Sequence, residues 1–317
     1  MQKTQLFTSM KKHILLLPAI FLIIQLAQAQ KPDAAVALVR YTFSHLRDTT
    51  DKANVYTENM ELLIGKNASV YRSADKRLQD EQMKKQIAEQ ISAGATNNIT
   101  LKAVGKTRAS NITYYQFQVE KKLIRQEKQF NNYLVDESWP VINWKITADT
   151  ASFGSLKCQK ATTVFKGRNY EAWFCPTLPF RSGPWKLNGL PGLIVEASDS
   201  KKEVVWKFAG LEDANKMTVN STSESSKNNP AGITRIIGLG DDENLSKTIA
   251  LPQNGIKTTE KELAQLKETM HKDPQAFVQA AMAGSGANIK VSSMSMPSKI
   301  TPLKSVENNS IELSEKP

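Results

Sequence analysis

The sequence predicts a mainly β protein of the α+β class, with one strongly curved, half-barrel-like antiparallel sheet and a few helices. Short runs rich in Val, Ile, Thr, Tyr, Phe and Trp recur over 34–211, and polar or glycine-containing turns separate them. Helical spacing of apolar residues is confined to one segment after Ser73 and two segments near the C-terminus. The 317 residues are enough for a β-rich domain with a substantial core.

The expected elements follow from local patterns. Ser73 is placed to cap a helix that ends before Gly94. Thr259 and Glu262 have the spacing of a capping box and start a second helix, and Asp273-Pro274 starts a third that ends at Gly284. Strands are expected at 34–43, 55–64, 68–71, 111–119, 123–126, 130–135, 141–146, 157–165, 168–175, 193–195 and 203–211.

Residues 1–29 have the layout of a cleavable secretory signal peptide. Lys11 and Lys12 precede an apolar run from Ile14 to Leu26, which ends in Ala27-Gln28-Ala29. No cysteine follows the cleavage point, so no lipid anchor is expected, and no later apolar run is long enough to span a bilayer. The protein is therefore expected to be exported, periplasmic or extracellular, without a transmembrane segment in the mature chain.

Composition divides the rest into a β-rich domain over 30–219, a linker with C-terminal helices over 220–284, and a polar, mobile tail over 285–317. The formal net charge is +11, and removing the signal's three lysines and no acids leaves 11 − 3 = +8. This charge favours acidic surfaces. The cations are dispersed, with no run of five or six, so nucleic acid is not an expected partner.

A hairpin at 157–175 is predicted in detail. With Lys166-Gly167 as its loop, Phe165 faces Arg168 and Cys158 falls opposite Cys175. Directly opposed strand residues are close enough for a bridge. Because these are the only two cysteines in a chain expected to be exported, a structural disulfide is predicted.

The hairpin is followed by a proline-rich connection over 176–191, since Pro176, Pro179, Pro184 and Pro191 cannot donate ladder hydrogen bonds. Within its last residues, Pro191-Gly192 suits a type II turn, with Leu190 and Leu193 pinning it to the core. A ligand-facing loop is the alternative. The structural motif consists of Gly189, Leu190, Pro191, Gly192, Leu193 and Ile194.

The runs 165–174, 183–186 and 189–194 together resemble the GLPGLI family of exported bacterial proteins, which is named for its signature and has no established activity. The resemblance implies a cell-envelope role, because similar proteins are often associated with outer-membrane receptor systems. The terminal Asn309-Ser310-Ile311-Glu312-Leu313 is similar to an Asn-Pro-Ile-Glu-Leu terminus of that family, with Ser310 in place of the proline. Cys175 departs from the family pattern, so the disulfide is expected to be particular to this chain.

Cations and aromatic rings concentrate in the same stretch and form the candidate ligand site. Planar guanidinium groups beside aromatic faces can hold a carboxylate, a sulfate or an acidic glycan. Arg168 is the foremost candidate, because the glycine turn is expected to aim it outward. The alternative is a purely structural role, with the aromatic rings in the core and the cations on the outer face of the hairpin. The candidate residues are Arg168, Tyr170, Trp173, Arg181, Trp185 and Lys186.

Catalytic patterns are missing from the sequence. His45 and His271 follow the signal peptide, neither in a zinc spacing, and no nucleophile or phosphate-loop motif occurs, so no metal or cofactor is expected. The predicted function is a non-catalytic binding or accessory module for a peptide, lipid, acidic glycan, or outer-membrane receptor or other envelope protein. The alternative is a hydrolase or transferase with an unrecognised carboxylate site, drawn from acids such as Asp136, Glu137, Glu171 and Asp199.

Overall fold

The computed structural model describes residues 32–94, 109–129, 131–216, 247–273 and 307–314. Three predicted segments lie outside these residues: the signal peptide, the polar stretch at 220–230 and the helix from Pro274 to Gly284. The unit from Asp33 onward contains every element described below.

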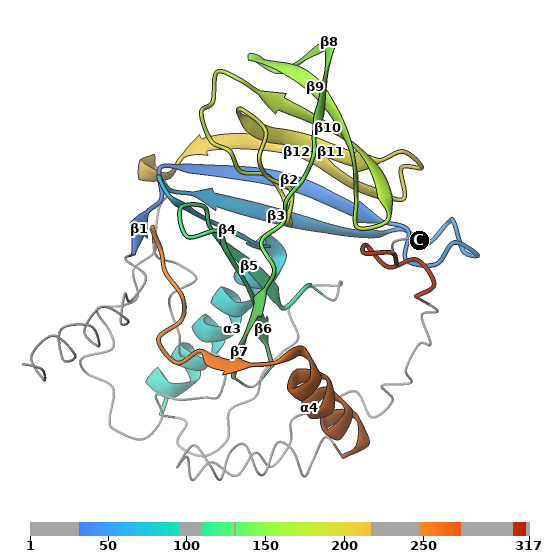
Figure 1. Cartoon of the computed structure of the whole chain (residues 1–317). Coiled ribbons are helices and arrows are strands. Elements are labelled where there is room, and N and C mark those ends of the chain that lie inside the picture. Colours follow the sequence, from blue (N-terminus) through green and yellow to red (C-terminus); the bar gives the residue numbers. More distant parts are fainter. Residues whose placement is uncertain (1–31, 95–108, 130, 217–246, 274–306, 315–317) are drawn as a thin grey trace, which may run out of the picture. The chain divides into compact units, whose positions relative to one another are not determined.

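One large open sheet dominates this unit (Figure 1). Its order is β14-β7-β6-β5-β4-β3-β2-β12-β11-β10-β9-β8, and every pair is antiparallel except β14 with β7, which are parallel. A two-stranded sheet pairs β1 (Asp33–Ala34) with β13 (Thr248–Ile249). The mainly β prediction is confirmed, with the difference that the sheet is mixed. The large sheet comprises β2 (Ala37–His45), β3 (Tyr56–Ile64), β4 (Ala68–Ser73), β5 (Ile112–Phe117), β6 (Lys122–Lys128), β7 (Asn132–Glu137), β8 (Lys145–Phe153), β9 (Leu156–Phe165), β10 (Arg168–Cys175), β11 (Leu193–Asp199), β12 (Val204–Asp213) and β14 (Ile256–Thr258).

Both faces of this sheet carry apolar clusters. Along β3, Leu62 and Ile64 belong to one cluster and Leu63 to the other, as the two-residue alternation of a strand requires. The larger cluster includes the aromatic side chains of β2, β10 and β12, and Trp206 within it is 1% exposed. The strands around β2 and β3 are therefore buried on both sides.

Two α-helices are described. Helix α3 (Ala74–Ser92) follows β4 directly and lies alongside the β4–β6 part of the sheet (Figure 1), and the Ser73 hydroxyl accepts the Lys76 amide at 2.9 Å. Helix α4 (Glu260–Lys272) starts with the predicted capping box, in which Thr259 accepts the amide of Glu262. A 3-10 turn, η2 (Ala214–Lys216), ends β12. None of the described helices has the length and apolar character that crossing a membrane requires.

The β9–β10 hairpin has the predicted register, with Arg168 opposite Phe165 and Ala172 opposite Ala161. The predicted disulfide is not shown, because both cysteines are free, buried thiols. The Cys175 thiol lies 3.1 Å from the Thr177 hydroxyl. Burial, with a smaller contribution from Cys175, raises the pKa of the Cys158 thiol to about 12, so this thiol is protonated at neutral pH.

The connection between β10 and β11 contains no strand, as its prolines predict. The expected type II turn is not formed. Instead the Gly192 amide donates to the Leu190 carbonyl at 2.8 Å, which closes a three-residue turn around Pro191, and the Leu193 amide is used by the Leu178 carbonyl at 3.1 Å. Leu190 and Leu193 are buried in the larger cluster, so they do anchor this corner to the core.

Strand β8 begins later than the predicted 141–146. The indole Nε1 of Trp144 donates to the Asn188 carbonyl at 2.8 Å, and Ile142 and Trp144 pack against the larger cluster. These contacts tie the residues before Lys145 to the proline-rich connection and leave the strand to start after them.

Candidate functional site

The aromatic candidate residues do not form one common exposed surface. Tyr170 and Trp185 are core residues, 1% and 3% exposed, and Trp185 stacks on Trp206 with ring centroids 5.7 Å apart. Trp173 is half-buried and packs against Phe153 at a centroid distance of 6.1 Å. For Tyr170 and Trp185 the alternative that places the rings in the core is correct, because both are buried in the larger cluster, while Trp173 packs against that cluster and is partly buried. Of the cations, Arg181 is exposed, whereas Lys186 is buried.

The expectation that the turn aims Arg168 outward is wrong, because this residue is only 4% exposed. Its guanidinium Nη1 lies 2.9 Å from the Asp199 carboxylate and 3.3 Å from the Glu203 carboxylate. Asp199 ends β11, which pairs with β10, and Glu203 lies just before β12. The sheet thus places two acids beside the first residue of β10, and their charges draw the guanidinium inward.

The other partner of Arg168 is the C-terminal segment, a name used here for residues 307–314. The Nε atom donates to the Ile311 carbonyl at 3.0 Å, and Nη2 donates to the Ser310 carbonyl at 2.5 Å and the Asn309 side-chain oxygen at 2.6 Å. The segment lies next to the loops that follow β2 and that join β9 to β10 (Figure 1, red). The mobile tail predicted over 285–317 thus contains a part that is held by hydrogen bonds.

Asn309 is the most completely bound residue of this segment. Its amide Nδ2 donates to the Leu46 carbonyl at 2.7 Å and to Glu203 at 3.1 Å, while its Oδ1 accepts from Arg168. Its backbone N–H donates to the Arg47 carbonyl at 3.1 Å, and its carbonyl lies 2.7 Å from His45 Nε2. Each polar group of this buried asparagine therefore has a partner, which an aspartate or leucine of similar size could not reproduce.

The residues after Asn309 add charge and apolar contacts. Ile311 packs against the larger cluster. The Glu312 carboxylate lies 2.5 Å from Lys186 Nζ and 3.3 Å from Lys166 Nζ. The Leu313 amide donates to the Lys166 carbonyl at 3.0 Å, and a Cβ at Gly167 would lie 2.8 Å from Leu313 Cβ. Gly167 is thus needed for its positive φ of 72° and for this close approach.

We call the surroundings of the C-terminal segment, formed by His45, Gly167, Arg168, Lys186 and Glu203, the Arg168 site. Burial opposes ionisation of Glu312, but Lys186 and Lys166 outweigh it and hold the pKa of that carboxyl below its usual value. Burial lowers the pKa of His45, and Arg47 and Arg168 add to this effect. At neutral pH the site therefore presents a neutral imidazole and a charged carboxylate.

Sequence reasoning missed His45, Glu203 and Asn309 as members of this site and did not assign Asp199 to it. The signal that pointed to the segment was its similarity to an Asn-Pro-Ile-Glu-Leu terminus. The carboxylates named from the sequence each form an ion pair with a lysine or arginine: Asp136, Glu137, Glu171 and Asp199. Within the described ranges, no group of His, Cys, Asp and Glu could hold a metal ion.

The fold and the site together define an open, mainly antiparallel sheet protein whose buried arginine holds its own C-terminal segment. A family described as "Protein of unknown function (Porph_ging)" matches residues 163–196, which include Arg168, Lys186 and the Gly189–Ile194 corner. The match is short, and it does not establish the GLPGLI name. No curated protein matches the chain in sequence.

Solved structures of PNGF-II match the chain in two space groups, P21 and C2. They are 11% and 10% identical to it, cover 73% of it in both cases, and have a TM-score of 0.43. The chain spans only about a third of the solved proteins, 33% and 32% of their lengths.

Proposed function

We propose that the protein is an exported, non-catalytic peptide-binding module of the cell envelope. Its ligand is a peptide segment with the pattern Asn-x-Ile-Glu-Leu, held at the Arg168 site. Export rests on the layout of residues 1–29, and binding rests on the contacts of the C-terminal segment.

The observation that carries this proposal is the complete pairing of Asn309. Its side chain is bound by the Leu46 carbonyl just after β2, by Arg168 of β10 and by Glu203, so three separate parts of the chain contact one side chain. Glu312 pairs with two lysines, and Ile311 packs against an apolar surface. The site therefore selects a polar side chain at position 309, an aliphatic one at 311 and an acidic one at 312. A partner with the same pattern would meet the same donors and acceptors.

The chain's own segment competes for this site, and tethering gives it a high effective concentration, of the order of millimolar for a flexible connection. The test therefore uses the full chain with Asn309→Ala and Ile311→Ala, which weaken the resident segment. A labelled peptide of residues 305–317 should bind this double variant saturably and bind the unaltered chain at least about tenfold more weakly.

Matched peptides keep the test independent of protein folding. A peptide with Asn309→Asp places a carboxylate against Glu203 and loses the donor to the Leu46 carbonyl, so it should not compete. The proposal fails if the double variant does not bind the peptide, or if it binds the Asn309→Asp peptide equally well. Equal binding of the labelled peptide to the double variant and to the unaltered chain would place the peptide elsewhere on the molecule and contradict the site.

A further inference from the structure

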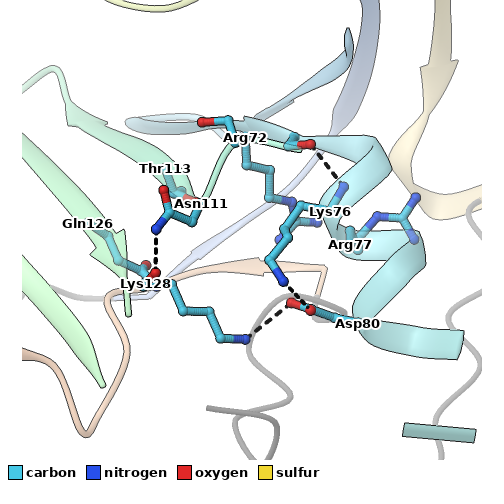
Figure 2. A pocket seen from close by; sticks show the side chains of 10 residues that line it. Arg72, Lys76, Arg77, Asp80, Asn111, Thr113, Gln126 and Lys128 are labelled. Carbon is cyan, nitrogen blue, oxygen red and sulfur yellow. Dashed lines mark hydrogen bonds and ion pairs between the residues drawn. The ribbon is translucent and has the colours of Figure 1, made fainter. Parts of the chain in front are cut away.

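A second, separate cluster of charge surrounds a small pocket between α3 and the strands β4, β5 and β6 (Figure 2). Arg72 comes from β4, Lys76 and Arg77 from the first turn of α3, and Lys128 from the end of β6. The remaining wall is polar and includes Asp80 together with hydroxyl and amide side chains. The pocket is small and opens to solvent.

The acids around this pocket are fewer than the cations. Asp80 is shared by two lysines, at 2.6 Å from Lys76 and 3.1 Å from Lys128. Behind the wall, Glu61 is fully buried and pairs with both arginines through their Nε atoms. Glu81 adds one further contact, to Arg77. Three carboxylates, Glu61, Asp80 and Glu81, thus pair with these four cations, and Asp80 is the one acid among the residues that line the pocket.

The pKa of Lys128 reflects the crowding of cations at this pocket. Burial lowers the pKa of Lys128, Asp80 opposes the shift, and the neighbouring Lys76 and Lys84 add to it by repulsion. The pocket thus holds cations close together in a partly desolvated place, where an anion would relieve their repulsion.

We propose that this pocket binds a compact oxyanion, a phosphate or sulfate group, between Lys76, Arg77 and Lys128. Figure 2 shows the Lys76 side chain from helix α3 and the Lys128 side chain from β6 meeting at Asp80, and Arg77 also lines the pocket. Donors on several sides suit a group with several oxygens, and each charge-assisted hydrogen bond to it is stronger than a neutral one. The open mouth admits either a free ion or the esterified end of a larger molecule.

The test is the shift in melting temperature of the full chain on adding inorganic phosphate or sulfate, at ionic strength matched with sodium chloride. A ligand that binds only the folded chain raises its melting temperature with concentration. Lys76→Gln should weaken phosphate binding about tenfold or more, and Lys128→Gln is a second variant with the same expectation. Lys157→Gln, an exposed position on β9, is the matched control and should respond like the unaltered chain.

A phosphate-dependent rise in the unaltered chain and the Lys157→Gln variant, absent from both pocket variants, would support the site. Equal rises in all four proteins, or no rise beyond that in chloride, would overturn it. A parallel measurement with glucose 6-phosphate distinguishes a free ion from a phosphate ester as the ligand. Binding of the ester at least as tight as that of free phosphate identifies a sugar phosphate as a ligand. Exclusion of the ester limits the pocket to free ions. The outcome is independent of the peptide test, since no residue is shared with the Arg168 site.

Discussion

Replacing Arg168 by alanine should destabilise the fold, because this arginine is a buried counterion. Its side chain is 2% exposed, and it is paired with Asp199, which is 3% exposed. Removing one partner of a buried ion pair costs about 3–5 kcal/mol, since the remaining charge is left uncompensated. Asp199 keeps two hydrogen bonds to the amides of Glu203 and Val204, which places the expected cost toward the lower end, at about 3 kcal/mol.

The same substitution also removes three hydrogen bonds to the C-terminal segment. For a unit of this size, 1 kcal/mol lowers the melting temperature by about 2–4 °C, so the variant should melt about 6–12 °C lower. Differential scanning calorimetry measures this directly, and Arg181→Ala, at an exposed arginine of the proline-rich connection, should change the free energy of unfolding by less than about 0.5 kcal/mol. Equal melting temperatures for Arg168→Ala and the unaltered chain would refute the reasoning.

Three further predictions concern other parts of the fold. Gly192→Ala should cost at least about 2 kcal/mol in urea unfolding, because its Cβ would lie 2.3 Å from the Cys175 carbonyl oxygen, and a neutral effect would contradict this packing. Burial lowers the pKa of His45, so the unfolded chain takes up its proton first; stability should fall as the pH drops below about 6.5, and His45→Gln should reduce that fall. Identical pH dependence in the two proteins would be inconsistent with a buried neutral imidazole. Alkylation after unfolding without reductant should add two adducts by mass spectrometry, at Cys158 and Cys175, whereas none would reveal a disulfide.

Local patterns predicted much of the sheet because they are decided by neighbours in the sequence. The glycine loop at Lys166-Gly167 and the two-residue alternation of the flanking strands set the hairpin register. The capping box at Thr259 and Glu262 set the start of α4 in the same way. The prolines at 176–191 excluded a strand, although the type of turn around Pro191 depended on which carbonyl reached the Leu193 amide.

The site was less predictable because its contacts are distant in sequence. Arg168 is 31 residues from Asp199 and 141 from Asn309, so no local pattern indicates that its charge is neutralised. Its position after a glycine turn is typical of an exposed cation, and the approach of β11 and the C-terminal segment overrides that expectation. For the pocket residues, Lys128 is 48 residues from Asp80, and the strand order that joins them appears only in the fold.

Hydrogen exchange of the C-terminal amides tests the central claim most directly, namely that the Arg168 site holds the segment as a bound peptide. The amides of Asn308, Asn309 and Leu313 donate to the Arg47 and Lys166 carbonyls and should exchange slowly in the unaltered chain. In the full chain with Asn309→Ala and Ile311→Ala, the backbone amides of the segment should exchange much faster, while those of β2 and β3 stay protected. Exchange in the unaltered chain at the rate of a free peptide would contradict the account.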